Sequence, residues 1–599
     1  MCRIAGIVTK NKTSLLQQDL LRMRDAMQHG GPDDAGLLVE ETDGLAMGHR
    51  RLSLIDLSAA GHQPLFSNDG NYAIIFNGEI YNYQEIKTEL QAKGYSFRTK
   101  TDTEVIVNAY AAWGVAAFAK FNGMYVFAIW DKQQQELVLA RDHAGIKPLY
   151  YSYTNNSFYF GSEIRSFKAL NANWPENTNW PLYFLSFGHL PEPVTTLQGV
   201  QPLPKGHYLR FNLATHQYSI KSFYNWQFNY NIQSKEAAVA AIKTELTAAV
   251  QRHLIADAPI GLFLSGGVDS SLLTLLAAPH LGKQLKTLSI YFEEEQFSEK
   301  PYQDLIIEKT GAQHQSFCVT QPMFENKLPD IFEAMDQPSI DAINTYFISG
   351  YAHEYGLTAV LSGVGADELW YGYSHFRSVQ RIQQLKRLPG FIQNMASLAN
   401  KHSYKKIAFL SLDEPVATAL FLRGLYTPAV VANITGTYES DVRKQLNTLA
   451  TTYNSSGTGT DYISWLETNF YMQNQLLKDA DYMSMWHSLE IRVPFLDKAF
   501  MELAAHTSPE LKMHPQTGKY LLIEAFKDLL PETIWNRRKQ GFTFPFEKWL
   551  LASQVASPVN TKEQHFFKQF QQGHINWSRY WSICLLNRWN KQHAATAGW

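Results

Sequence analysis

The chain has 599 residues, more than the roughly 250–300 that one hydrophobic core supports, so two or more domains are expected. Hydrophobic residues make up 45%, aromatic residues 13% and charged residues 18%, which indicates a folded protein and excludes a disordered one. The formal net charge of −2 provides no basic excess for a phosphate backbone, so no nucleic-acid partner is expected.

Membrane insertion and secretion are not expected either. No stretch approaches about 18 uninterrupted apolar residues, and the first ten residues lack the basic and apolar segments of a signal peptide. Three cysteines (Cys2, Cys318 and Cys584) are too few for a disulfide framework in so long a chain. We therefore expect reduced thiols and a cytoplasmic protein.

Short apolar runs bounded by Gly, Asn and Asp dominate residues 1 to about 160. Their β-branched and aromatic content predicts strands at 72–77, 124–130 and 136–140. Between these runs, 83–93 and 103–113 have the pattern of helices. This predicts a mixed α+β domain with much sheet.

From about residue 235 the pattern changes to alternating strands and helices, which predicts a parallel α/β sheet. Strands are predicted at 259–264, 285–292 and 358–362, and helices at 235–254, 271–278 and 302–309. The chain after 375 is expected to be mostly helical. The region 205–235 lacks clear periodicity, so we expect the domain boundary there, between domains at 1–215 and 235–599.

Cys2 is the first residue that suggests chemistry, because removal of Met1 would make it the N-terminal residue. A free α-amine has a pKa near 7.7–8.0 and can take the proton of the thiol, whose ionised form is the nucleophile. Taken alone, a cysteine here is more often a small apolar residue that begins an edge strand. Three further segments favour the catalytic interpretation.

Arginines in His49-Arg-Arg-Leu-Ser-Leu-Ile-Asp56 could bind the α-carboxylate of glutamine in bidentate fashion. In Asn77-Gly-Glu79 a side-chain amide and a backbone N–H could converge on an oxyanion, since Gly78 allows close approach. Asp102 precedes a predicted helix and could hold a substrate ammonium. The alternatives are a hairpin turn at Asn77-Gly78 and a helix cap at Asp102.

In combination, these segments resemble the class II glutamine amidotransferase domain, an N-terminal-nucleophile (Ntn) glutaminase with an αββα sandwich fold. The match covers nearly all of the first 165 residues and includes Cys2-Arg-Ile-Ala-Gly-Ile, Gly31-Pro-Asp33, Phe76-Asn-Gly-Glu-Ile-Tyr-Asn82 and Arg141-Asp-His143. The resemblance implies that Cys2 is the nucleophile and that Asn77 and Gly78 form the oxyanion hole. It implies glutamine binding by Arg51, Leu52, Ser53, Leu54, Ile55, Asn77, Gly78, Glu79 and Asp102.

One departure from this family lies at Gly30. The family usually has His-Arg-Gly-Pro-Asp where this chain has His29-Gly-Gly-Pro-Asp33. Arg50 is a candidate to replace the missing arginine.

Ser265-Gly-Gly-Val-Asp-Ser270 lies between a predicted strand and a predicted helix. Glycines, hydroxyls and a helix N-terminus together favour phosphate binding. Asp269 beside phosphates makes sense only with a metal between them, so we predict a magnesium ligand. A Gly-Gly pair is usually only a turn, but the full string resembles the PP-loop of ATP pyrophosphatases, which adenylate a carboxylate and release pyrophosphate.

A second segment, from Leu361-Ser-Gly-Val-Gly-Ala-Asp-Glu to Tyr373, also follows an apolar strand. With Arg537-Arg-Lys-Gln-Gly-Phe542 it resembles the synthetase domain of the asparagine synthetase B family, from about 235 to 550. The resemblance implies ATP and Mg²⁺ as cofactors, with the metal at Asp269 and Asp367. It implies ATP binding by Phe263, Ser265, Gly266, Gly267, Asp269, Ser270, Ile290, Ser362, Gly363 and Lys539.

The resemblance implies a glutamine-hydrolysing, ATP-dependent ligase that converts aspartate to asparagine, AMP and pyrophosphate, and a homodimer. Many family members have a glutamate, a candidate base, where this chain has Val364. Another carboxylate acceptor, a biosynthetic intermediate or a peptide, therefore stays open. A catalytically silent binding protein would be expected to have lost site residues, and the predicted ones are present.

Overall fold

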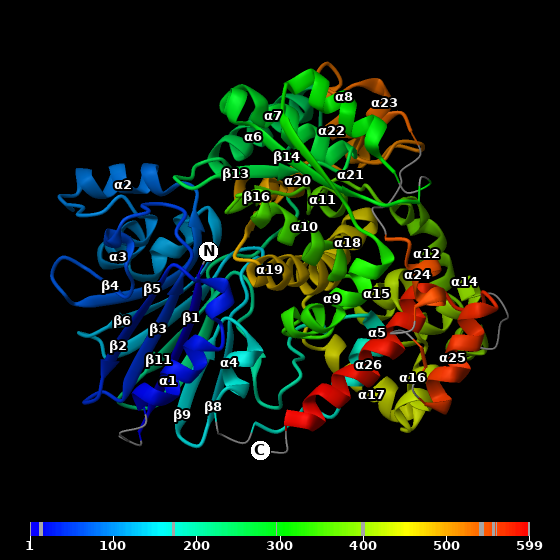
Figure 1. Ribbon diagram of the computed structural model, residues 1–599, viewed down its shortest axis with the longest axis horizontal. Helices are drawn as coiled ribbons and strands as arrows, with labels where there is room; N and C mark the ends of the chain where they lie inside the picture. Colours follow the sequence, from blue (N-terminus) through cyan, green and yellow to red (C-terminus); the bar gives the residue numbers. More distant parts are fainter. Residues whose placement is uncertain are drawn as a thin grey trace.

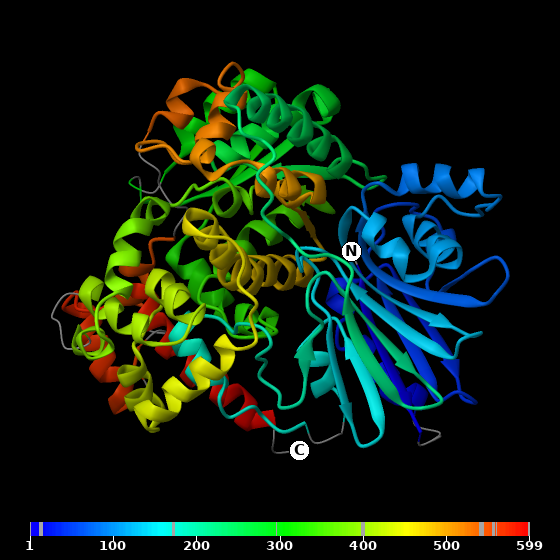
Figure 2. The same ribbon diagram turned by 180° about the vertical axis from the view of Figure 1, so that it is seen from behind.

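The structure is a computed structural model that describes residues 2–10, 16–170, 174–294, 296, 298–396, 402–537, 544–553, 557–558 and 560–596. Two antiparallel sheets form the N-terminal domain, and one parallel sheet with a large helical part forms the rest (Figure 1). The two parts pack side by side in both views (Figures 1 and 2).

Each sheet of the N-terminal domain has six strands. The first has the order β10 (Gln201–Pro202), β8 (Tyr150–Thr154), β9 (Ser157–Gly161), β1 (Arg3–Thr9), β3 (Leu45–Arg51) and β2 (Asp34–Glu40). The second has the order β12 (Gln217–Ser222), β11 (His207–Asn212), β7 (Glu136–Arg141), β6 (Gly123–Asp131), β5 (Tyr72–Ile80) and β4 (Leu65–Phe66).

Alternation along the strands explains why the sheets stack. In β1, Ile4 and Val8 face the second sheet, whereas Ala5 and Ile7 face α1 (Leu16–Asp25). In β5, Ala73 and Ile75 likewise lie between the sheets. Successive strand residues point to opposite faces of a sheet. Because consecutive residues of these strands are apolar, both faces of each sheet are apolar, and another layer must pack on each face.

Helices α2 (Tyr83–Ala92) and α3 (Asp102–Trp113) supply the cover for the second sheet, where they pack on Ile74 and Phe76 of β5. With α1 on the first sheet, this makes four layers in the order helix, sheet, sheet, helix. The predicted αββα sandwich is confirmed, and so are the predicted helices at 83–93 and 103–113.

Strand β12 ends the second sheet at Ser222, so the N-terminal fold continues past residue 215. Helix α6 (Lys235–His253) then begins the C-terminal domain. Sequence periodicity missed β11 and β12 because their outward residues are polar or aromatic and partly exposed.

The C-terminal domain is built on a five-stranded sheet in which every pair is parallel. Its order is β15 (Gln313–Cys318), β14 (Lys286–Tyr291), β13 (Ile260–Phe263), β16 (Ala359–Leu361) and β17 (Glu490–Arg492). The chain progresses from β13 to β14 and β15 on one side and to β16 and β17 on the other. In open parallel sheets, ligands bind where the order reverses, at the carboxyl ends of the strands. Here that point lies after β13 and β16.

Helices cover both faces of this sheet, and many more extend from it (Figures 1 and 2). Those that pack on or near the sheet are α6, α7 (Val268–Leu281), α8 (Lys300–Thr310), α9 (Gln321–Ala334), α10 (Ile343–Glu354), α11 (Ala366–Leu369), α19 (Leu477–Trp486), α20 (Lys498–His506) and α22 (Tyr520–Phe526). Helix α4 (Ile164–Lys168) packs in the N-terminal domain, beside β8 and β9. The remaining helices are α5 (Trp180–Phe187), α12 (Val379–Lys386), α13 (Gly390–Met395), α14 (His402–Lys405), α15 (Val416–Arg423), α16 (Pro428–Thr435), α17 (Glu439–Ala450), α18 (Gly459–Leu466), α21 (Pro509–Lys512), α23 (Glu532–Trp535), α24 (Phe546–Ala552), α25 (Thr561–Gln571) and α26 (Trp577–Thr596).

The prediction of a mostly helical chain after residue 375 is confirmed. Among the described residues, no single helix has the length and apolarity to cross a membrane, although the bent pair α15 and α16, which meets at 82°, passes on length and composition.

Candidate active sites

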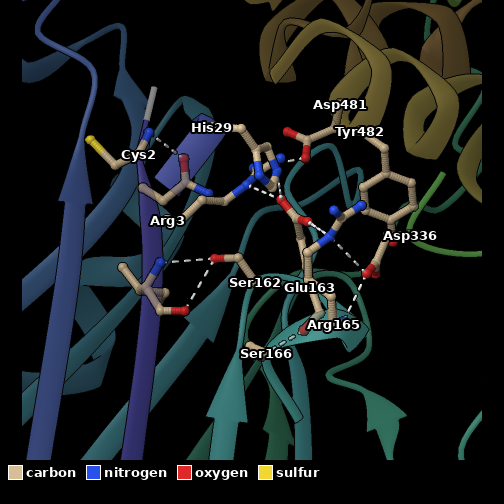
Figure 3. Close-up of polar contacts among 12 residues, drawn as sticks. Cys2, Arg3, His29, Ser162, Glu163, Arg165, Ser166, Asp336, Asp481 and Tyr482 are labelled. Carbon is tan, nitrogen blue, oxygen red and sulfur yellow. Dashed lines mark hydrogen bonds and ion pairs between the residues drawn. The ribbon is translucent and has the colours of Figure 1, made fainter. Parts of the chain in front are cut away.

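Cys2 lies at the start of β1 and is buried, with 8% of its surface exposed. Figure 3 shows Cys2 beside Arg3 at the N-terminal end of β1. The backbone N–H of Cys2 donates to Asn77 Oδ1 at 3.1 Å, and its sulfur lies 4.0 Å from the carbonyl oxygen of Leu52. Burial raises the pKa of the thiol, so the cysteine needs a nearby base to become a nucleophile. Met1, whose removal would free the α-amine, lies outside the described residues.

Asn77 and Gly78 lie within β5, opposite Val126 and Tyr125 of β6, so they are not a hairpin turn. Asn77 is fully buried, and its Nδ2 has no hydrogen-bond partner among the described residues. Gly78 has φ +145°, and a Cβ there would lie 2.1 Å from the Met124 carbonyl oxygen. The site thus combines a buried, uncommitted amide donor beside the thiol with a backbone that only glycine can adopt.

Asp102 does not cap its helix. Thr101 is the N-cap of α3 and accepts from Glu104 N, whereas Asp102 accepts from Ile80 N at 2.9 Å. Burial raises the pKa of Asp102 to about 7. Glu79 is also buried, which raises its pKa well above the usual range, although Arg492 opposes this from 3.4 Å. Burial therefore disfavours the charged form of both carboxyls.

The loop Arg51–Ile55 follows β3 and lies against the C-terminal domain, where Asp257 N donates to Leu54 O at 2.8 Å. The Arg51 guanidinium points into its own loop and donates to the carbonyls of Ser58 (2.9 Å) and Asp56 (2.5 Å). Arg51, Leu52 and Ser53 line a cavity of about 890 Å³ that residues of both domains enclose. Arg51 therefore holds the loop that follows β3, and its contact with a substrate carboxylate stays a prediction.

The absence of an arginine at Gly30 has a steric explanation. A Cβ at Gly30 would lie 2.8 Å from both Cγ and Nε of Arg3, so the Arg3 side chain occupies that space. Arg50 pairs with Asp25 on the surface at 2.7 Å and does not replace the missing group.

Arg3 is fully buried and joins the two domains (Figure 3). Its guanidinium pairs with Glu163 at 2.5 Å and with Asp481 of α19 at 2.9 Å. Lys147 Nζ lies 3.3 Å from the other oxygen of Asp481. The neighbouring cations of His29, Arg3 and Arg165 outweigh burial and hold the pKa of Glu163 below its usual range. A buried ion network therefore starts one residue from the nucleophile.

The Ser265–Ser270 loop connects β13 to the N-terminus of α7 and is held by its own hydroxyls. Ser265 N donates to Ser270 Oγ at 3.1 Å, and Gly267 N donates to Ser265 Oγ at 3.3 Å. Gly266 has φ +78°, in the left-handed region. Glycine and serine in this order thus fold the loop so that the N-terminus of α7 faces the end of the sheet, a site that favours phosphate.

A cavity of about 340 Å³ opens at this point, after β13 and β16, and most of the predicted nucleotide residues line it. They are Phe263, Ser265, Gly267, Asp269, Ser270, Ile290, Ser362, Gly363 and Asp367. Gly266 is not among them, and its carbonyl accepts from Arg537 Nη2 at 3.0 Å. Lys539 lies outside the described residues.

Asp269 and Asp367 both contact Lys519, whose Nζ lies 2.7 Å from Asp269 Oδ2 and 2.9 Å from Asp367 Oδ1. The loops that carry Asp269 and Asp367 approach each other closely at Gly363. A side chain there would place its Cβ 2.8 Å from Asp269 Cβ, so the absence of a side chain at Gly363 permits the approach. Two carboxylates beside a phosphate loop form a hard-oxygen donor set that suits magnesium, which takes its remaining ligands from water and phosphates. Among the described residues, no group of three or more His, Cys, Asp or Glu side chains forms a closed metal cage.

Further carboxyls line the same cavity beyond the phosphate loop: Asp341, Glu368 and Asp479, next to Val364. Burial raises the pKa of Asp341 to about 6 and that of Glu368 to about 7. Asp479 accepts from Ser339 Oγ at 2.7 Å. This acidic end is where an acceptor would lie.

Sequence reasoning missed Lys519, Arg537 and Arg492. Lys519 follows a glycine and Arg537 begins the quoted basic segment, but nothing local links the side chain of either to the phosphate loop some 250 residues earlier. Arg492 pairs with Glu79, which lies in the other domain. Only the fold brings these pairs together.

Comparisons with known proteins agree with this division. A family model described as a glutamine amidotransferase domain matches residues 1–224, and one described as asparagine synthase matches residues 241–569. Asparagine synthetase [glutamine-hydrolyzing] 1 of Bacillus subtilis is 34% identical over 92% of this chain and 88% of its own length. Amidase chry2 of Gibberella zeae is 26% identical over 92% of this chain and 90% of its own.

Among solved structures, the glutamine phosphoribosylpyrophosphate amidotransferase of B. subtilis aligns with 53% of this chain and 81% of its own. The identity is 16% and the TM-score 0.30, values too low to support an argument.

Proposed function

Because the chain belongs to the glutamine-hydrolysing asparagine synthetase family, whose members are ATP-using ligases, we propose that it takes ammonia from glutamine at Cys2 and transfers it to a carboxylate activated by ATP. The first candidate acceptor is the side chain of aspartate, which would give asparagine, AMP and pyrophosphate. One observation carries the proposal: the Cys2–Asn77 pair and the Ser265–Ser270 loop lie in one molecule, on two domains joined by buried contacts.

In the first half-reaction, the Cys2 sulfur attacks the side-chain amide carbon of glutamine and forms a thioester, and the NH2 group leaves as ammonia with the proton that came from the thiol. Water then hydrolyses the thioester, which gives glutamate and the free thiol. Asn77 Nδ2 and the Gly78 N–H donate to the oxyanion, the kind of interaction that often contributes about 10²–10³ to kcat. The substrate ammonium pairs with Asp102 and Glu79, two buried carboxyls whose pKa values are raised by burial. The α-amine freed by removal of Met1 takes the thiol proton.

In the second half-reaction, the Ser265–Ser270 loop binds the ATP phosphates, with Phe263 and Ile290 beside the adenine. The acceptor carboxylate attacks the α-phosphorus, pyrophosphate leaves, and ammonia then displaces AMP from the acyl-adenylate. Magnesium held by Asp269 and Asp367 would neutralise charge on the phosphates. We assign the same role to Lys539 from the family resemblance.

We propose that ammonia passes between the two sites through a buried apolar region. Leu52 and Met124 of the glutaminase domain belong to the same buried cluster as Leu361, Ala480 and Ile491 of the synthetase domain. Ala480 and Ile491 also line the nucleotide cavity. An apolar environment disfavours the charged ammonium ion, so ammonia would stay a nucleophile on this path.

A second candidate function, amidation of a carboxylate other than aspartate's, is favoured by the acceptor end of the cavity. Val364 cannot act as a base, and the described residues that line this cavity include no lysine or arginine to pair with the α-carboxylate of aspartate. The test is to offer the protein a panel of carboxylic acids, with and without amino groups, and to measure the rate of pyrophosphate release with each. This decides between aspartate and another acid as the acceptor. Highest kcat/KM with aspartate supports asparagine formation, and preference for another acid supports the alternative.

We further propose a cytoplasmic homodimer, as expected from the resemblance. Light scattering of the purified protein measures the mass of the assembly, and cell fractionation locates it. A monomeric mass at assay concentrations would contradict the dimer.

Replacement of the nucleophile tests the division of labour. We predict that Cys2→Ala abolishes glutamine-driven amide formation and leaves ammonia-driven pyrophosphate release within about twofold of wild type, because only the first half-reaction uses the thiol. Intact mass must first show that Met1 is absent from the wild-type control. Loss of both activities in the variant would contradict the proposal, as would a trimmed wild type that releases no pyrophosphate with any acid.

A further inference from the structure

Lys519 occupies the position between the two carboxylates assigned to magnesium. It is buried, with 6% of its surface exposed, and its ammonium lies within 2.9 Å of an oxygen of each aspartate. Lysine is a compact positive charge with three donors, so one side chain can compensate both carboxylates. The chain therefore supplies its own cation at this place.

The backbone around Lys519 is built for this contact. Lys519 has φ +55° and ψ +37°, a left-handed conformation that residues other than glycine rarely adopt. A Cβ at Gly518 would lie 2.9 Å from the Gly372 carbonyl oxygen, and one at Gly372 would lie 1.8 Å from Asp367 Oδ1. Gly372 and Gly518 thus let residues 518–519 pack closely against the loop that carries Asp367. The left-handed conformation of Lys519 directs its side chain toward Asp269 and Asp367.

A divalent cation cannot share these oxygens with the ammonium, because two positive charges at such short range in a buried site repel strongly. The metal must displace Nζ, and the displaced ammonium then needs another anion. The phosphates of a nucleotide in the adjacent loop are such an anion, and lysine is a common phosphate ligand. Metal and nucleotide are therefore linked through one side chain.

We propose that Lys519 is a further residue of the nucleotide site: it holds Asp269 and Asp367 in the nucleotide-free protein and transfers its ammonium to a phosphate oxygen when magnesium and ATP bind together. This inference rests on the proposed synthetase function. Its consequence is that the divalent cation alone binds weakly, whereas ATP strengthens its binding. By linkage, the metal strengthens ATP binding by the same factor.

Binding of Mn²⁺ without nucleotide tests the inference directly, since Mn²⁺ prefers the same oxygen ligands and is visible by electron paramagnetic resonance. We expect Lys519→Met to bind Mn²⁺ alone at least about tenfold more tightly than wild type, because the competing ammonium is gone. The same variant should bind Mg-ATP at least about tenfold more weakly by calorimetry, because the phosphates lose a partner. The factor by which ATP strengthens Mn²⁺ binding should fall accordingly.

Lys527→Met is the matched control. Lys519 and Lys527 lie at opposite ends of α22, and Lys527 is largely exposed. Replacing either lysine by methionine changes the net charge by the same amount. It should bind both ligands like wild type. Lys519→Arg, which keeps the charge, should keep Mn²⁺ binding weak, and Lys519→Gln repeats the test if the methionine variant does not fold.

Unchanged affinity for Mn²⁺ alone in Lys519→Met and Lys519→Gln would overturn the inference while leaving the proposed function intact. A wild-type protein that binds no Mg-ATP would instead overturn the proposed synthetase function, and the role of Lys519 with it. Glutamine hydrolysis by each variant reports whether the other domain is still folded.

Discussion

Asp102 illustrates how one buried side chain can make glutamine binding depend on pH. Its carboxylate accepts a hydrogen bond from the backbone N–H of Ile80, and burial raises its pKa from the ordinary 3.8 to about 7. Below pH 7 the carboxyl of the free protein is therefore mostly protonated and neutral. A neutral carboxyl cannot pair with a substrate ammonium, so glutamine must bind with release of a proton.

We predict that the KM for glutamine rises as pH falls below about 7, approaching tenfold per pH unit. Asp102→Asn should raise KM about 10- to 100-fold at pH 8 and remove this pH dependence, because it deletes a charge-assisted hydrogen bond. The measurement is glutaminase KM across pH 5.5–8.5, with Asp69→Asn, on an exposed turn of the same domain, as control. A flat wild-type KM over roughly pH 6 to 8 would refute the assignment.

At the scale of single residues, sequence alone was sufficient where chemistry is encoded in a contiguous string. Cys2, Asn77 and Gly78 come together as predicted, because β1 and β5 place them within one hydrogen bond. Sequence was insufficient for Lys519, whose pairing depends on loops far apart along the chain. It also left Gly30 unexplained, because the steric reason is the packing of Arg3.

Among the elements, α19 and β17 matter most, because each touches both sites. Asp479 and Ala480 of α19 line the nucleotide cavity, and the next residue, Asp481, pairs with Arg3. Ile491 of β17 lines the same cavity, and the next residue, Arg492, pairs with Glu79. Two short elements thus link the cavity to residues beside Cys2 and in the glutamine site.

We predict that Arg3→Met and Asp481→Asn each lower the free energy of unfolding by about 3–5 kcal/mol, because each leaves a buried partner charge uncompensated. The double variant should lose less than the sum, which chemical denaturation can measure as a coupling energy. Arg22→Met, which removes a half-exposed pair with Asp19, should change stability little and serves as control. Additive losses in the double variant would show that the pair does not join the domains.

The elements themselves were partly readable from the sequence. Buried strands such as β13 and β16 are continuous apolar runs and were predicted within two residues. β15 and β17 were not predicted, since Gln313–Cys318 is largely polar and Glu490–Arg492 consists mainly of charged residues. In β17 the buried charges are compensated, because Glu490 pairs with Arg492 and Arg492 also pairs with Glu79 of the other domain. Such tertiary contacts cannot be read from the strand propensity of the local sequence.

In the whole molecule, the interface has two kinds of contact with different consequences. Buried ion pairs fix the orientation of the domains, since charges out of water tolerate little displacement. The interface also contains an apolar cluster that includes Leu52, Met124 and Ile491. Motifs in the two halves of the chain predict glutamine hydrolysis and ATP-dependent ligation. Only the packing of the domains shows that one apolar cluster contains residues of both.

This connection predicts that nitrogen moves from one site to the other without mixing with the solvent. We expect that synthesis from amide-¹⁵N glutamine, with a large excess of unlabelled ammonium in the buffer, yields an amide that keeps most of its ¹⁵N. Ammonia released to neutral water would become ammonium, lose its nucleophilic lone pair and be diluted, whereas the apolar cluster disfavours the charged form. Mass spectrometry of the product amide gives the ratio of isotopes, and Cys2→Ala, which can use only external ammonium, should give unlabelled product. A wild-type product whose label matches the isotopic composition of the buffer would show that ammonia leaves the protein between the two steps.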